Sequence, residues 1–183
     1  MVSGVDMAVN LGGIAMKNPI NTAAGTFGYS WQFEGFYDVS QLGAITMKGV
    51  ARVPWDGNPA PRMCELTSGM MNSVGLANPG IDAFVDHVGS YMDELENRGT
   101  RVIMQMAAHS VQEMVDVVER TEELAPHVSA LELNISCPNL ARGGTPLGAT
   151  PRQAAEVMRA VRPLTTLPLL VKMAPVNVAE IGK

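Results

Sequence analysis

Residues 131–139 have the sequence Leu-Glu-Leu-Asn-Ile-Ser-Cys-Pro-Asn, which begins as a strand and ends in a loop. The apolar side chains alternate with polar ones, as in a β-strand with one buried face. Pro138 ends this pattern because proline has no N–H to donate to a sheet. The thiol of Cys137 and the carboxamides of Asn134 and Asn139 therefore gather where a strand becomes a loop. A buried cysteine beside turn-forming asparagines would explain the same cluster. The rest of the chain must therefore show whether its role is structural or functional.

Length and composition limit the alternatives. The chain has 183 residues, 46% of them hydrophobic, which predicts one domain with a core and excludes a disordered chain. The net charge is −5 and no run of Lys or Arg occurs, so neither nucleic acid nor a membrane surface is an expected partner. No apolar run reaches the ~20 residues that span a bilayer, and residues 1–10 show no signal-peptide pattern.

Cysteine and histidine usage adds two expectations. The two cysteines form no CxxC pair, which indicates reduced thiols and a cytoplasmic protein. The three histidines lack the spacing of metal ligands, so no metal site is expected.

Strand and helix patterns alternate along the chain. Helices are expected over 81–95, from Ser110, from Thr150 and from Val178, and a short one within 26–42. Capping boxes open the two that start at Ser110 and Thr150. Strands are expected at 18–24, 44–48, 101–106, 130–136 and 168–173, after a hairpin over 8–16 and with a long Gly/Pro-rich loop over 49–79.

This spacing is that of βαβ units, so the fold class is α/β with a parallel sheet and right-handed crossovers. No GxGxxG motif follows the first strand, which argues against a dinucleotide-binding Rossmann domain. The sequence stops inside an apparent element at 181–183, and a TIM (β/α)₈ barrel normally needs ~250 residues. We therefore expect about the first five strands of such a barrel.

Polar residues recur where the expected strands end, which in parallel α/β folds is where ligands bind. Lys48, Gln105 and Lys172 close three strands, and Gly25 follows another. Lysines there suit an anionic ligand or an electron-rich ring, and carboxamides suit the edge of a flat heterocycle. The long loop adds Asn72–Gly80, whose glycines allow backbone N–H groups close to a ligand.

A series of motifs over nearly the whole chain resembles the dihydroorotate dehydrogenases, FMN-dependent barrel enzymes of pyrimidine synthesis. The motifs are Asn18–Pro19 with Ala24–Gly28, Lys48–Gly49, Gly57–Arg62, Asn72–Gly80, Leu131–Asn139 and Val171–Pro175. The resemblance implies that residues 1–183 are the N-terminal part of one FMN-binding TIM-barrel domain, without the C-terminal strands and phosphate-binding loops.

The subclass also follows from the resemblance. Cys137 stands where class 1, the cytosolic class, has its catalytic base, whereas the membrane class has serine there. Arg142–Gly148 and Gly25–Tyr29 are similar to the NAD-linked B subclass. That subclass implies a partner subunit carrying FAD and a [2Fe–2S] cluster, in a heterotetramer that passes electrons to NAD⁺. The alternatives are the fumarate-linked class 1A enzyme, a dihydropyrimidine dehydrogenase and a dihydrouridine synthase. The absence of basic patches argues against a tRNA substrate, and Gly57–Arg62 favours dihydroorotate.

The resemblance further implies residue roles. Cys137 would take a proton from C5 of dihydroorotate, for which a thiol pKa of ~8.5 is within tuning range. Lys172 would lie by the flavin, where positive charge favours the reduced anion. Substrate contacts are implied for Lys48, Asn72, Ser73, Val74, Gly75, Leu76, Asn134 and Asn139. FMN contacts are implied for Ala24, Gly25, Lys48, Gly49, Gln105, Asn134 and Lys172.

Two residues depart from the family pattern: Ala24 replaces a frequent Ser, and Gln105 replaces a frequent Asn. Both changes are expected to alter FMN affinity without removing activity. A further alternative is that the 183-residue chain is an inactive fragment by itself, because barrel enzymes commonly bind phosphate with the loops after strands 7 and 8. We expect the isolated chain to hold FMN weakly or not at all.

Overall fold

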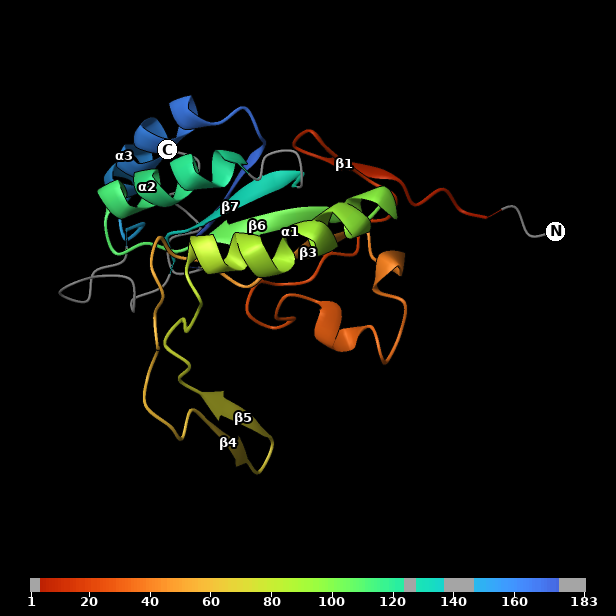
Figure 1. The fold of residues 1–183 in the computed structure, drawn as a ribbon, viewed down its shortest axis with the longest axis horizontal. Helices are drawn as coiled ribbons and strands as arrows, with labels where there is room; N and C mark the ends of the chain where they lie inside the picture. Colours follow the sequence, from red (N-terminus) through yellow and green to blue (C-terminus); the bar gives the residue numbers. More distant parts are fainter. Residues whose placement is uncertain (1–3, 124–127, 137–146, 175–183) are drawn as a thin grey trace.

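The computed structural model describes residues 4–123, 128–136 and 147–174 (Figure 1). Its centre is a four-stranded parallel sheet in the order β3-β6-β7-β8. The strands are β3 (Ala44–Thr46), β6 (Arg101–Met106), β7 (Ala130–Asn134) and β8 (Leu169–Lys172). Helices α1 (Ile81–Asn97), α2 (Val111–Thr121) and α3 (Pro151–Val161) lie between successive strands in the chain and cover one face of the sheet.

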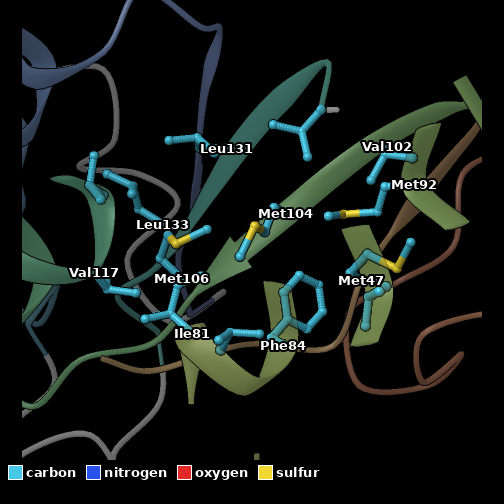
Figure 2. Close-up of a cluster of buried hydrophobic side chains, with 14 of the residues drawn as sticks. Met47, Ile81, Phe84, Met92, Val102, Met104, Met106, Val117, Leu131 and Leu133 are labelled. Atoms are coloured by element: carbon cyan, nitrogen blue, oxygen red, sulfur yellow. The ribbon is translucent and has the colours of Figure 1, made fainter. Parts of the chain in front are cut away.

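The main core lies between this sheet face and the helices. Alternate residues of the strands point into it because side chains of a strand alternate between its two faces. Val102, Met104 and Met106 of β6 pack there with Phe84 of α1 and Val117 of α2, and all five are almost fully buried (Figure 2). The amphipathic pattern predicted for α1 is confirmed, since its buried residues recur at helical spacing.

A hairpin closes the N-terminal end of the opposite sheet face, which we call the inner face. Strands β1 (Val9–Leu11) and β2 (Ile14–Met16) pair antiparallel, as the sequence predicted. Ile14 and Met16 are buried in a second, smaller cluster with Ala44, Ile103 and Ala130 from the central strands. The inner face is therefore apolar at the end where the strands begin.

Side-chain caps fix where α2 and α3 begin. The Ser110 hydroxyl accepts from the Glu113 backbone N–H at 3.1 Å. The Thr150 hydroxyl accepts from the Gln153 N–H at 3.3 Å, and Pro151 occupies the first turn. Both caps satisfy N–H groups that have no partner inside a helix. A 3₁₀ turn, η5 (Arg162–Leu164), then continues α3.

Three parts of the chain differ from the expected elements. The expected strand 18–24 is reduced to one parallel bridge, between Asn21 and Ala44. Instead of a helix, the segment 26–42 contains two 3₁₀ turns, η1 (Trp31–Phe33) and η2 (Val39–Gln41). The loop 49–79 contains a second hairpin, β4 (Met63–Leu66) with β5 (Gly69–Asn72), which projects from the body of the molecule (Figure 1). The helix expected from Val178 lies outside the described residues.

A parallel sheet with helices on one face, and with a hairpin covering the N-terminal end of the other face, corresponds to one side of a TIM barrel. The described strands do not close on themselves. The predicted fold class is thus confirmed, with β3, β6, β7 and β8 as four of the five expected strands.

Candidate active site

A hollow of about 410 Å³ opens where the central strands end. This volume lies in the range of about 300–1,000 Å³ that is usual for small-molecule sites. The hollow brings together residues that are far apart in the sequence, from the loop after residue 20 to the end of β8. Its lining residues are Ala24, Gly25, Thr26, Lys48, Gly49, Asn72, Val74, Leu76, Gln105, Asn134, Ser136 and Lys172.

Lys48 and Gly49 are held in place by backbone hydrogen bonds that continue past β3. The Lys48 N–H donates to the Gly28 carbonyl at 2.9 Å, and the Val50 N–H donates to the Gln105 carbonyl at 2.9 Å. The chain around Gly49 therefore still runs beside β6 after the regular ladder has ended. This places the Lys48 side chain and the Gly49 backbone at the same edge as Gln105.

The carboxamide of Asn134 is oriented by its neighbour two residues later. The Ser136 hydroxyl donates to Asn134 Oδ1 at 2.9 Å, and the Ser136 N–H donates to the same oxygen at 3.3 Å. Because the oxygen is engaged, the amide N–H groups of Asn134 are the part left for a ligand.

Gln105 is almost fully buried and its amide nitrogen, Nε2, donates to Glu132 Oε1. The two residues are direct partners across the parallel pair β6 and β7. A Cβ atom added to Gly49 would lie only 2.7 Å from Gln105 Oε1. Any residue other than glycine would therefore push this oxygen out of its present position.

Two lysine side chains bring positive charge to the hollow. Burial, with a smaller contribution from the nearby Arg62 guanidinium, lowers the pKa of Lys48 from its usual 10.5. Lys172 enters the same hollow from the end of β8. A ligand with an anionic group would relieve the cost of holding these charges together.

The sequence-predicted site residues fall into three groups. Ten of them line the hollow: Ala24, Gly25, Lys48, Gly49, Asn72, Val74, Leu76, Gln105, Asn134 and Lys172. Ser73 and Gly75 are not among its lining residues and support the adjoining loop, where Ser73 accepts from Asn58 Nδ2 at 2.7 Å. Cys137 and Asn139 lie outside the described residues.

Thr26 and Ser136 line the hollow and Glu132 contacts Gln105, although none of the three was among the predicted site residues. Ser136 and Glu132 flank Asn134 at a spacing of two, so the strand period already placed them on the inner face. Thr26 directly follows Gly25 and donates to the Ala23 carbonyl at 2.6 Å, which closes the turn there. The sequence signal that could have identified Thr26 was its position as a polar residue directly after a glycine turn.

No group of three or more His, Cys, Asp or Glu side chains in residues 4–123, 128–136 and 147–174 is arranged to hold a metal ion. Across the same ranges, no helix is both long and apolar enough to cross a membrane.

The fold and the hollow define a TIM-barrel protein with a candidate ligand site at the C-terminal ends of its strands. The chain belongs to the dihydroorotate dehydrogenase family, whose family model matches residues 6–183. It is 44% identical, over 94% of its length, to a dihydroorotate dehydrogenase B (NAD(+)) catalytic subunit of Lachnoclostridium phytofermentans, and covers 56% of that relative. It is 42% identical to the protein of the same name from Geobacillus kaustophilus, with 96% and 54% covered.

A solved structure shows the same fold at low sequence identity. The DHODH of Eimeria tenella, crystallised in complex with ferulenol, matches 96% of this chain with a TM-score of 0.74 and 18% identity, and the match covers 54% of that protein. The chain thus spans just over half the length of these relatives.

Proposed function

We propose that the protein containing this chain oxidises (S)-dihydroorotate to orotate in the de novo synthesis of pyrimidines. The observation that carries the proposal is the hollow itself. It unites ten residues that the sequence motifs had assigned separately to substrate and FMN contacts. The family membership and the names of the relatives support the same reaction.

The chemistry of the lining residues fits a flavin. The ring of FMN has carbonyl oxygens and ring nitrogens that need donors, and one N–H that needs an acceptor. The hollow offers the ammonium groups of Lys48 and Lys172 and the Asn134 amide as donors, and the Gln105 oxygen as an acceptor. We propose that FMN is held by Ala24, Gly25, Lys48, Gly49, Gln105, Asn134 and Lys172. Bound FMN supplies a two-electron acceptor for the hydride that leaves C6 of the substrate.

The substrate would lie on the side of the hollow formed by the long loop. Dihydroorotate carries a carboxylate and amide groups, so it needs both cations and carboxamides around it. Asn72 and Asn134 supply the carboxamides, and Lys48 supplies a cation beside them. Val74 and Leu76 give an apolar wall. From the motifs that resemble the family, we also propose Ser73, Gly75 and Asn139 as substrate contacts.

We propose Cys137 as the general base. As a thiolate it would take the proton from C5 while hydride leaves C6, which converts the C5–C6 single bond into the double bond of orotate. It follows Asn134–Ser136 directly, and Asn134 and Ser136 both line the hollow. A general base contributes roughly 10²- to 10⁴-fold to a rate.

We further propose that electrons leave through a partner subunit that carries FAD and a [2Fe–2S] cluster, and reach NAD⁺. The names of the relatives from L. phytofermentans and G. kaustophilus support this acceptor. The fumarate-linked class 1A reaction is the alternative. A cytoplasmic location is proposed because the exposed, free thiol of Cys64 suits a reducing compartment.

The test uses the protein that contains this chain, purified with and without its partner subunit. We expect flavin to copurify, dihydroorotate to reduce it, and NAD⁺ rather than fumarate to sustain turnover. A Cys137→Ala variant should retain flavin and lose turnover roughly 10²- to 10⁴-fold. Near-normal rates in Cys137→Ala would refute the base, and reduction by dihydrouracil but not dihydroorotate would refute the substrate.

A further inference from the structure

The pair Gln105 and Glu132 lies on the inner face of the sheet and has no assigned role in the reaction beyond the FMN contact implied for Gln105. Both side chains point to the same face because they are direct partners on parallel strands β6 and β7. Gln105 is 3% exposed, so its carboxamide is withdrawn from water. A buried carboxamide needs defined partners at both ends.

The carboxylate of Glu132 fixes the orientation of that carboxamide. An ionised carboxylate accepts hydrogen bonds and cannot donate them, so only the Nε2 end of Gln105 can face it. The observed hydrogen bond is of this kind, from Gln105 Nε2 to Glu132 Oε1. The Oε1 end of Gln105 must then point away from Glu132.

The Oε1 end points toward the backbone of Gly49. The position of a Cβ on Gly49 would be 2.7 Å from this oxygen. Gly49 and Gln105 both line the hollow, and within the described ranges no group donates a hydrogen bond to Gln105 Oε1. The oxygen is therefore an unused acceptor at the wall of the ligand site.

We propose that Glu132 is a positioning residue: it holds the Gln105 carboxamide so that Oε1 accepts a hydrogen bond from an N–H group of the bound heterocycle. The inference rests on the proposed function, with FMN as that heterocycle. Glutamine is required for this arrangement, because its side chain reaches Glu132 with one end and the hollow with the other. If the carboxamide turned over, two donors would meet at the ligand and the N–H would lose its acceptor.

The experiment is a double-mutant cycle on FMN affinity in the protein that contains this chain, stripped of flavin and titrated with FMN by fluorescence quenching. Glu132→Gln keeps the shape of the side chain but can donate as well as accept, so it no longer selects one orientation. We expect it to weaken FMN about two- to tenfold, the range of a single neutral hydrogen bond. Gln105→Leu should weaken FMN by a similar factor.

The double variant is the decisive one. If Glu132 acts through Gln105, Glu132→Gln should have no effect on FMN affinity once Gln105 is Leu. The bound flavin should also show the same shift of its absorbance bands in both single variants. Glu119→Gln, on the exposed side of α2, removes the same charge far from the hollow and should leave affinity and spectrum unchanged.

Each outcome is decisive. Full additivity in the cycle would overturn the inference, because Glu132 would then act on FMN independently of Gln105. Wild-type affinity and spectrum in Gln105→Leu would overturn it as well, even if Glu132→Gln failed to fold. A wild-type protein that binds no FMN would overturn the proposed function itself, and with it this inference.

Discussion

The two faces of the β3-β6-β7-β8 sheet differ sharply, although their residues alternate along the same strands. On β6, Val102, Met104 and Met106 face the helices and are buried in the main core. Ile103 and Gln105, one residue away in each case, face the inside of the barrel. The helix-facing side carries apolar side chains that fill the main core. The inner face instead carries apolar side chains where the strands begin and polar side chains where they end.

That gradient follows the strand direction. At the N-terminal end the inner face carries Ala44, Ile103 and Ala130, closed by the β1–β2 hairpin. At the C-terminal end it carries Gln105 and Lys172, which line the hollow together with the end of β7. Stability and ligand binding are therefore assigned to different residues of the same short strands, and variants can separate them.

The largest effect is expected on the helix-facing side. Phe84→Ala removes a fully buried ring from the main core and should lower the free energy of unfolding by about 3–5 kcal/mol. This is a large part of the usual total of about 5–15 kcal/mol. Chemical denaturation measures it, with Phe36→Ala as control, because Phe36 is 83% exposed. A change in the FMN affinity of the folded fraction would show that the two faces are not separable.

The second expected effect lies on the inner face, where a substitution should weaken FMN binding and leave stability nearly unchanged. In Gly49→Ala the new Cβ would meet Gln105 Oε1 at 2.7 Å, and the flexible amide would have to move. We expect FMN to bind on the order of tenfold more weakly, whereas the unfolding free energy should change by less than about 1 kcal/mol. Gly35→Ala meets nothing within 4 Å and is the matched control. Unchanged FMN affinity in Gly49→Ala would argue against a ligand at this wall.

A third, smaller effect concerns Lys48, whose replacement should increase the stability of the fold but weaken ligand binding. Burial lowers the pKa of Lys48, so charging this lysine costs folding free energy at neutral pH. Lys48→Met should raise the melting temperature at pH 7 by about 1–3 °C while weakening FMN and orotate.

The pH dependence of this gain has a defined direction. Between the lowered pKa of Lys48 and its usual 10.5, the unfolded chain binds more protons, so wild-type stability rises with pH there. The advantage of Lys48→Met should thus vanish above pH 10.5. Arg152→Met, an exposed charge on α3, is the control. A gain that persists at high pH would show that packing, and not charge, is responsible.

The regular part of the fold was predictable because it depends on periodicity. Strand alternation and the capping residues Ser110 and Thr150 identified β3, β6, β7, β8 and the helices α2 and α3. The β4–β5 hairpin was missed because every one of its residues is exposed, so no buried face leaves an alternating pattern. The segment 26–42 forms 3₁₀ turns and packs against α1, where the rings of Tyr29 and Phe84 meet with centroids 5.1 Å apart. A local sequence pattern does not predict such a long-range contact.

The site was predictable to a similar extent and for a similar reason. Lys48, Gln105 and Lys172, which line the hollow, were predicted because each lies at or just beyond the end of a strand, and the ends of parallel strands share one edge. The partner of Gln105 was not found, because the pairing with Glu132 depends on the register between two strands that are separated by α2. Sequence periodicity predicts the face of a residue but not its neighbour across the sheet.

The smallest expected effect concerns a polar atom on the helix-facing side. The hydroxyl of Tyr29 is buried and has no hydrogen-bond partner in the described ranges, and its ring meets Phe84 edge-on at 5.1 Å. Tyr29→Phe should leave the unfolding free energy unchanged or raise it by up to about 1 kcal/mol. Tyr91→Phe is the contrasting variant, because the Tyr91 hydroxyl donates to Glu34 Oε1 at 2.9 Å, and its loss should cost about 1 kcal/mol.

Alkaline titration sharpens this comparison. Burial raises the pKa of Tyr29 to about 12, whereas the unfolded chain loses this proton near pH 10. The folded state therefore holds the proton longer, and wild-type stability should fall as the pH rises from about 10 to about 12. Tyr29→Phe should remove its share of that fall, as measured by denaturation at pH 9 and about pH 11. If Tyr29→Phe instead destabilised the protein at neutral pH as much as Tyr91→Phe, that result would show that the Tyr29 hydroxyl has a hydrogen-bond partner. The helix-facing side would then depend on polar contacts, as the inner face does.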